Sequence, residues 1–460
     1  MRNGPPTIED TAAEIAKIAS ALQSPDLQIA LGGDPFVKGE VPATESIGLA
    51  AAVVILLIAF GSVVAMGLPI VTALIGIGLS LSAIPLISAV LPTADFTSTV
   101  AAMIGLGVGI DYALFMVTRY RTELAAGRDV DSAIAAAVRT SGRAIVFAGG
   151  TVVVSLLGLL LIGMDFLKGF AVASSLTVAI SVVAAISLVP AVLAIIGRRI
   201  DRLRIHRRGY ATLNRDNLGR RWGRLIQRNP VKAVIGGGGL LLLAGLPVFA
   251  MRLAVSDEGN DPVGTTTRVA YDRLAEGFGP GVNGPLLIVS EDPAAADATV
   301  QTVRATDGVA FVGEPTTSAD GAISVFAAYP STSPQSPATE HLVRELRDDL
   351  PSSVHVGGET ASNVDFASFM AERLPWFIGA VLLVSFLLLF AVFRSVLVPL
   401  KAVVLNLVSI AAAYGAMVAV FQWGWFSSIL HIEPAPIEPW APMMLFAIVF
   451  GLSMDYEVFL

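Results

Sequence analysis

The sequence predicts an α-helical polytopic membrane protein, with about nine spanning helices and an α+β ferredoxin-like domain outside the membrane. Of its 460 residues, 54% are hydrophobic and only 15% are charged, whereas soluble domains carry about 25% charged residues. Apolar runs of about 20 residues, long enough to cross a bilayer as a helix, recur along the chain. The expected spans lie near residues 46–66, 68–91, 98–118, 143–163, 169–196, 231–251, 374–393, 396–420 and 441–460.

The distribution of basic residues predicts the orientation of these spans. Residues 119–143 hold five Arg, and residues 198–232 hold eleven Arg and one Lys. Residues 252–373, in contrast, hold seven basic and eighteen acidic residues. Because loops rich in Lys and Arg stay in the cytoplasm, we expect a multi-pass protein of the cytoplasmic membrane with residues 1–44 and 252–373 outside. Residues 200–208 could also lie on the membrane surface and attract anionic lipid.

The stretch between the sixth and seventh expected spans has the pattern of an α+β domain. After a helix-like segment at 266–278, apolar runs with strand character alternate with segments of helical periodicity. The resulting order, βαββαβ, is that of the ferredoxin-like split unit. The expected strands are 285–290, 309–313, 323–329 and 353–356, and the expected helices are 294–306 and 339–350.

The two halves of the chain repeat one another. A helix expected at Ile8–Leu22 and a strand at Asp26–Leu31 correspond to the last helix and strand of the later outer domain, and the turn at residues 60–63 matches the one at 393–396. Such internal repeats are common in transporters. Because the first copy begins inside its outer domain and the second stops inside a helix, we expect a fragment of a longer protein, in which strand 27–31 lacks its native neighbours.

These patterns divide the chain into six predicted regions. The expected extracytoplasmic parts are 1–44, the tail of a first outer domain, and 252–373, a second outer domain. The expected membrane parts are 45–197, a first bundle; 231–251, a single helix; and 374–460, a second bundle that is truncated. Residues 198–230 form a basic cytoplasmic linker.

Two Asp-Tyr pairs lie inside apolar runs and are the candidate site. They are Asp111-Tyr112 and Asp455-Tyr456, in matching contexts of the two halves. A carboxylate at the bilayer centre costs roughly 2.5–3.5 kcal/mol on insertion scales, so such residues usually serve a function. If the two helices are adjacent, Asp111 can meet Tyr456 and Asp455 can meet Tyr112. The cluster would then hold and release a proton; a structural hydrogen bond between helices is the alternative.

Small and aromatic residues surround each pair. Gly107 and Gly109 precede Asp111 on a face that is nearly bare, which favours close helix packing. A phosphate-binding loop is the competing interpretation, but no strand precedes these glycines and no Lys follows in register. Phe115 and Phe459 lie four residues after each Asp and predict either core packing or a hydrophobic plug beside the proton site.

A second polar pair lies on the helix expected at 143–163. Thr151 and Ser155 are four residues apart and share one helix face. They would either extend a path for protons or water, or hydrogen-bond to the backbone of their own helix.

Several other functions are disfavoured by the composition. The chain has no Cys, so it has no disulfide framework, and its four His are scattered, which argues against a metal site. No nucleophile–base pair or nucleotide loop is visible, so we expect no enzyme and no cofactor. We expect no nucleic-acid partner either, because the basic residues follow the membrane topology.

The two motifs resemble those of the resistance–nodulation–division superfamily. Gly109-Ile110-Asp111-Tyr112-Ala113-Leu114-Phe115 and the run from Gly451 to Phe459 are similar to the MmpL-type branch of actinobacteria, whereas drug-efflux relatives usually carry an Asp-Asp pair in one helix and a Lys in the other. The resemblance implies proton-motive-force-driven export of lipids or other hydrophobic molecules across the cytoplasmic membrane. It also implies that Asp111, Tyr112, Asp455 and Tyr456 form the proton relay, with protons as the coupling ion.

Other functions stay open from the residues alone. The chain could be a membrane scaffold or sensor that does not transport, in which the Asp-Tyr pairs are structural. It could also be an auxiliary of protein secretion, or an inactive fragment. Membrane lipids and a hydrophobic substrate are the expected partners, while a homo-oligomer and accessory proteins are left open.

Overall fold

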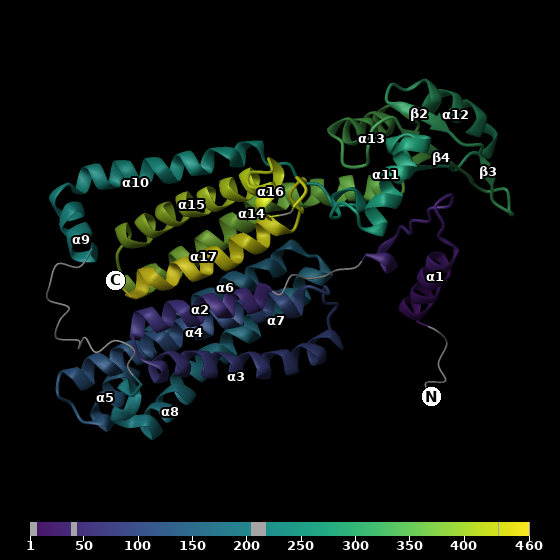
Figure 1. The fold of residues 1–460 in the computed structure, drawn as a ribbon. Coiled ribbons are helices and arrows are strands. Elements are labelled where there is room, and N and C mark those ends of the chain that lie inside the picture. Colours follow the sequence, from purple (N-terminus) through teal and green to yellow (C-terminus); the bar gives the residue numbers. More distant parts are fainter. Residues whose placement is uncertain (1–6, 38–43, 204–217, 431, 460) are drawn as a thin grey trace. The chain divides into compact units, whose positions relative to one another are not determined.

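The computed structural model describes residues 7–37, 44–203, 218–430 and 432–459 (Figure 1). It separates into two compact units. The sheet unit comprises Met1–Glu40, Pro247–Glu372 and Gly415–Trp440, and the helical unit comprises Val41–Leu246, Arg373–Tyr414 and Ala441–Leu460.

The described part of the chain is mostly helical, and much of it is apolar enough to lie in a membrane. Seven helical segments are long and apolar enough to cross a bilayer, and two shorter apolar helices, Gly48–Phe60 and Ala441–Met454, lie where two further spans are expected. The count of nine therefore stays a prediction. The main helices are α2 (Thr44–Phe60), α3 (Val63–Ser88), α4 (Thr97–Ala125), α5 (Val130–Ala137), α6 (Arg143–Leu157), α7 (Asp165–Val183), α8 (Val189–Ile196), α9 (Leu218–Arg228), α10 (Pro230–Gly245), α14 (Glu359–Phe393), α15 (Leu397–Met417) and α17 (Ala441–Phe459).

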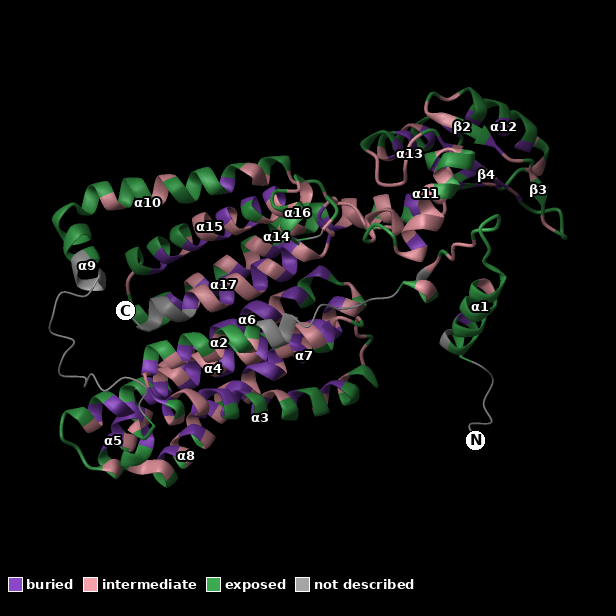
Figure 2. Ribbon diagram, viewed as in Figure 1, coloured by how far each residue is buried: buried purple, intermediate pink, exposed green. Residues whose placement is uncertain are grey.

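Burial in the helical unit follows the helix faces. In Figure 2 buried residues are frequent on α4, α6 and α7, whereas α10 is exposed along most of its length. Exposed apolar side chains are the expected outer surface of helices that lie in lipid. The largest side chains that are almost wholly buried in this unit are Tyr112, Tyr120, Phe170, Phe446, Phe450, Met116, Ile145, Leu156, Leu159, Ile162, Leu167 and Leu193.

Helix α4 packs closely because two of its glycines have no side chain. A Cβ at Gly105 would lie 2.7 Å from Cγ2 of Thr177 on α7, and a Cβ at Gly109 would lie 3.1 Å from Cβ of Ala73 on α3. Both distances are shorter than an ordinary contact, so larger residues would push these helices apart. Gly107 differs from the sequence expectation: it is exposed, and a Cβ there would meet no described atom within 4 Å.

One end of the helical unit is fixed by polar contacts. The Ser62 hydroxyl, in the turn between α2 and α3, donates to the carbonyl oxygens of Ile200 (2.9 Å) and Arg202 (3.0 Å). The buried guanidinium of Arg121 at the end of α4 donates to Asp201 (2.8 Å) and lies 5.3 Å from the ring centroid of Phe60. These contacts fasten the segment after α8 to α2, α3 and α4, because a buried guanidinium is stable only when it is paired.

The sheet unit is built on an antiparallel sheet. Its strands lie in the order β2-β4-β1-β5, and the short β3 also pairs with β4. Alternate residues of β1 and β4 point into an apolar core, which helices α12 and α13 complete. The elements are α11 (Thr266–Phe278), β1 (Leu286–Ser290), α12 (Ala296–Ala305), β2 (Val309–Val312), β3 (Thr316–Thr317), β4 (Ser324–Pro330), α13 (Pro337–Asp349) and β5 (Val354–Gly357).

The strand expected at Asp26–Leu31 is not formed. Helix α1 (Ile8–Leu22) is present, and Thr7 caps it together with Asp10, but the following residues make only one isolated bridge, between Ser24 and Leu27. The Leu31 amide donates instead to Oγ1 of Thr266, at 2.8 Å. The predicted strand is absent because a strand must pair with the free edge of another strand, whereas this segment contacts the first residue of α11.

The two glycines of α4 provide a matched test of this packing. We expect Gly109→Leu to destabilise the protein by about 1–3 kcal/mol, because overpacking forces neighbouring helices to move. We expect Gly107→Leu, two residues earlier on the exposed face, to change stability far less. Thermal unfolding of the purified protein in detergent measures both variants. Equal destabilisation by the two substitutions would contradict the packing described here.

Candidate functional site

Asp111 and Tyr112 lie at the middle of α4. The Asp111 side chain is half-buried, and Tyr112 is only 1% exposed. The Tyr112 ring lies against Gly149 of α6, where an added Cβ would be 3.5 Å from both Cε2 and the hydroxyl oxygen of the tyrosine. The same Cβ would collide with Val182 of α7. The Tyr112 ring is thus in ordinary van der Waals contact with α6 at this position, whereas Val182 of α7 occupies the space that a side chain at position 149 would need.

Helix α17 packs antiparallel along α6 (Figure 1). The Ser155 hydroxyl donates to the carbonyl oxygen of Ala447, at 2.8 Å. One turn further along α17, a Cβ at Gly451 would be 3.1 Å from Cα of Val152. Residue numbers thus rise on α17 as they fall on α6. With 3.6 residues per turn, the next turn of α17, at position 455, lies level with Gly149.

Tyr112 and position 455 of α17 therefore both lie at the level of Gly149 on α6. Tyr112 contacts Gly149 directly, and the backbone of α17 reaches the same level at position 455. The side chains of Asp455, Tyr456 and Phe459 lie outside the described residues, so their pairing with Asp111 and Tyr112 stays a prediction. Phe115, one turn after Asp111, is half-buried.

A buried amide supports α17 just before its Asp-Tyr pair. Asn406 of α15 is 4% exposed; its Nδ2 donates to Sδ of Met454 at 2.9 Å, and its Oδ1 accepts a hydrogen bond from Ser453. Sequence reasoning missed this group. The available signal is a lone Asn inside the apolar run 396–420, because amides in a membrane usually bond across helices.

The repeat gives this amide a counterpart in the first half. Aligning the two turns places Asn406 opposite Ala73, and aligning the two Asp residues places Ser453 opposite Gly109. Ala73 and Gly109 are the contact pair of α3 and α4. The same helix contact is thus made by small residues in one half and by a hydrogen bond in the other.

The second polar pair of the sequence has two different roles. Thr151 donates within its own helix, to the carbonyl oxygen of Ala148 at 2.7 Å. Ser155 instead bonds across to α17, at Ala447. Within the described residues, no group of three or more His, Cys, Asp or Glu is placed to hold a metal ion.

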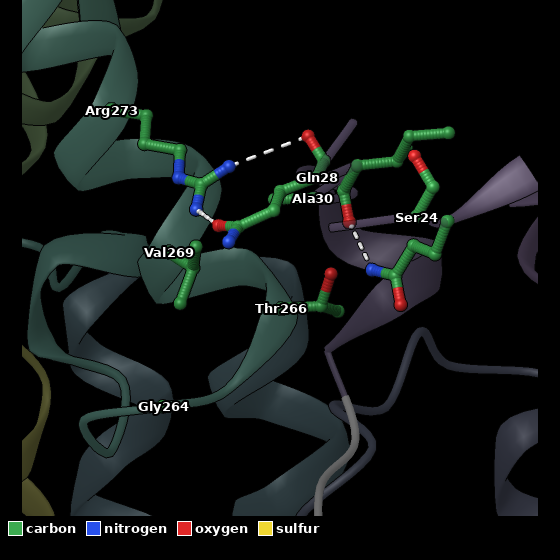
Figure 3. Close-up of a pocket in the computed structure, with 9 residues that line it drawn as sticks. Ser24, Gln28, Ala30, Gly264, Thr266, Val269 and Arg273 are labelled. Atoms are coloured by element: carbon green, nitrogen blue, oxygen red, sulfur yellow. Dashed lines mark hydrogen bonds between the residues drawn. The ribbon is translucent and has the colours of Figure 1, made fainter. Parts of the chain in front are cut away.

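The sheet unit contains two cavities beside α11. One has a volume of about 600 Å³ and the other about 690 Å³, and both are lined by Gln28, Ala30 and Arg273. Figure 3 shows the first, where Arg273 Nη1 donates to the Gln28 carbonyl (3.3 Å) and its Nη2 contacts the Gln28 side chain. The first cavity is polar, whereas the second also contains Leu274, Phe278 and Val282.

A half-buried carboxyl group bonds to one of the residues that line the second cavity. The Tyr271 hydroxyl, in the lining of that cavity, donates to Oδ2 of Asp257 at 3.1 Å, and the Gly259 amide donates to Oδ1 at 2.9 Å. Burial raises the pKa of the Asp257 carboxyl, and burial followed by the charge of Asp257 raises the pKa of Tyr271. The pair fastens the segment that follows α10 to α11.

The fold and the paired Asp-Tyr positions define a multi-pass protein of the cytoplasmic membrane with internal repeats and a sheet unit. The family model described as the MMPL family matches residues 3–233 and 253–460. The chain belongs to the MMPL family.

Several relatives are known. The chain is 37% identical over 451 residues to the membrane protein YdfJ of Bacillus subtilis, covering 94% of this chain and 61% of that protein. It is 32% identical to the mycolic acid-containing lipids exporter MmpL11 of Mycolicibacterium smegmatis, covering 92% of this chain and 46% of that protein. It is 28% identical to the trehalose monomycolate exporter MmpL3 of Mycobacterium tuberculosis, covering 95% of this chain and 52% of that protein. The chain thus spans about half the length of these relatives.

The contact between Asn406 and Ser453 predicts an energetic coupling. In a double-mutant cycle of Asn406→Ala and Ser453→Ala, we expect a coupling of about 0.6 kcal/mol and at most about 1.7 kcal/mol, the range for hydrogen bonds between membrane helices. Detergent-induced unfolding of the protein in bicelles measures it. Strictly additive losses of stability would show that this hydrogen bond does not support α17.

Proposed function

We propose that this chain carries the proton-coupling site of a transporter that exports lipids or other hydrophobic molecules across the cytoplasmic membrane, driven by the proton motive force. The observation that carries the proposal is the convergence on Gly149: Tyr112 contacts it, and position 455 of α17 is level with it. Two relatives are named as lipid exporters, which supports the substrate class.

The chemistry follows from the position of the carboxyl. Asp111 is half-buried among apolar helices, where desolvation favours the neutral acid and a nearby hydroxyl favours the anion. In the proposed relay, Asp111 and Asp455 exchange protons with water, and the hydroxyl groups of Tyr112 and Tyr456 donate to whichever carboxyl group is ionised. Each proton that enters down a membrane potential supplies about 2.3 kcal/mol per 100 mV.

A change of charge at Asp111 can move helices because α4, which carries Asp111, is closely packed against its neighbouring helices. Gly105 and Gly109 let α4 pack closely against α7 and α3, and Gly149 lets α6 pack closely against α7 beside Tyr112. A neutral Asp111 tolerates an apolar neighbour, whereas an anion requires water or a donor. Protonation would therefore shift α4 relative to α6, and this shift would couple proton entry to the rest of the transporter.

The sheet unit is the proposed substrate-handling part. Its strand order and antiparallel pairing match the split βαβ arrangement, and we assign it as a ferredoxin-like porter domain outside the membrane. The two cavities beside α11 have volumes typical of ligand sites. Arg273 and Gln28 lie next to the apolar Leu274 and Phe278, which suits a molecule with a polar head and an apolar tail.

The matched pair Asp111→Asn and Asp95→Asn tests the proton site. Both changes remove one carboxylate, but Asp95 is exposed in the loop before α4. We expect Asp111→Asn to reduce potential-driven proton uptake by proteoliposomes to the rate of protein-free vesicles, and Asp95→Asn to leave it unchanged. An internal pH-sensitive dye measures the uptake. Unchanged uptake in Asp111→Asn, with normal folding, would favour a structural role of the pair in a membrane scaffold or sensor.

A further inference from the structure

Helix α9 separates apolar and basic residues onto opposite sides. Leu218, Trp222, Leu225 and Ile226 follow the spacing i, i+4, i+7 and i+8, which places them on one face. Trp222 is 64% exposed and Leu225 is 54% exposed, so the described part of this face is not covered by the protein's own helices. The remaining positions are polar, basic or glycine, and the helix contains no acidic residue.

The chain places this helix at a membrane surface. Only Asn229 separates α9 from α10, and its backbone angles (φ −136°, ψ 58°) break the helix before Pro230 begins the next one. Because α10 is apolar and long enough to span, its first turn lies at the boundary between lipid and water. Figure 1 shows α9 turned out of line with α10, so α9 runs across the end of a spanning helix.

Exposed cations lie on the polar side of α9 and continue into α10. Arg224 and Arg228 lie one turn apart on α9, and Lys232 follows one turn later at the start of α10; all three are exposed. Guanidinium groups bind phosphate through paired N–H donors. Cations on the polar side of an amphipathic helix, at the entry of a membrane span, complement a bilayer that carries anionic headgroups.

We propose that α9 lies in the plane of the membrane and binds anionic phospholipid, with Trp222, Leu225 and Ile226 among the acyl chains and Arg224 and Arg228 on the lipid phosphates. The helix thereby fixes the depth and tilt of α10 and makes this part of the protein sensitive to lipid charge. The inference does not depend on proton coupling. A protein partner on the same apolar face is the competing occupant, and the experiment below distinguishes it.

The experiment uses the full chain, which contains no Cys, so that a single introduced cysteine can carry a nitroxide label. Leu225→Cys probes the apolar face, and Gln227→Cys, on the opposite side of the same turn, is the matched control. The labelled proteins are reconstituted into bilayers of phosphatidylcholine alone or with phosphatidylglycerol. Collision with oxygen, which concentrates in lipid, and with a water-soluble nickel chelate reports the surroundings of each label.

We expect the Leu225→Cys label to be accessible to oxygen and protected from nickel in anionic bilayers, and the Gln227→Cys label to be accessible to nickel. Adding Arg224→Gln and Arg228→Gln should lower the ratio of inserted to exposed label roughly fivefold per arginine, since each basic residue near an anionic surface contributes about that factor. Ile226→Cys serves as a second probe of the same face if Leu225→Cys folds poorly.

Three results would overturn the proposal. Equal nickel accessibility at both positions would mean that α9 lies in water. Protection of the Leu225→Cys label from both reagents would mean that protein, rather than lipid, covers this face. Equal insertion with and without phosphatidylglycerol would mean that the arginines do not select anionic lipid.

Discussion

The packing of Tyr112 against Gly149 is the contact on which the proposed mechanism depends. A carboxyl in a membrane is costly unless donors or water surround it, and the residue next to Asp111, Tyr112, contacts α6 at Gly149. Because a side chain at position 149 would collide with Val182, the glycine sets how closely α6 approaches α7, and Tyr112 of α4 contacts α6 at the same place. Position 455 of α17 lies level with this residue of α6, so the same packing also affects how α17 is placed relative to Tyr112.

The two halves use equivalent positions differently. Ala73 and Gly109 let α3 and α4 touch without polar atoms, whereas Asn406 and Ser453 form a hydrogen bond at the equivalent place. Dispersion forces and close fit stabilise a contact between small residues, whereas an amide–hydroxyl hydrogen bond also requires a particular orientation of its donor and acceptor. The second half is therefore fixed in rotation as well as in distance, which orients α17 just before Asp455.

Much of this arrangement is predictable from the sequence, for identifiable reasons. The apolar runs and the two Asp-Tyr pairs are local signals, since hydrophobicity and an isolated charge need no knowledge of the fold. The strand expected at Asp26–Leu31 fails because a strand depends on a partner elsewhere in the chain. The roles of Gly149 and Asn406 escape prediction for the same reason, since Gly149 is one of many membrane glycines until Tyr112 is seen beside it.

The central claim is that Asp111 takes up and releases a proton at this site. Infrared difference spectroscopy between low and high pH, on the protein in lipid bilayers, measures it directly through the carbonyl stretch of protonated carboxyl groups. The account predicts that one component of the protonated-carboxyl band, separate from those of the other carboxyl groups, titrates in the unmodified protein and is missing from the Asp111→Asn spectrum. Identical difference spectra for the two proteins would contradict it, because Asp111 would then not exchange a proton over that range.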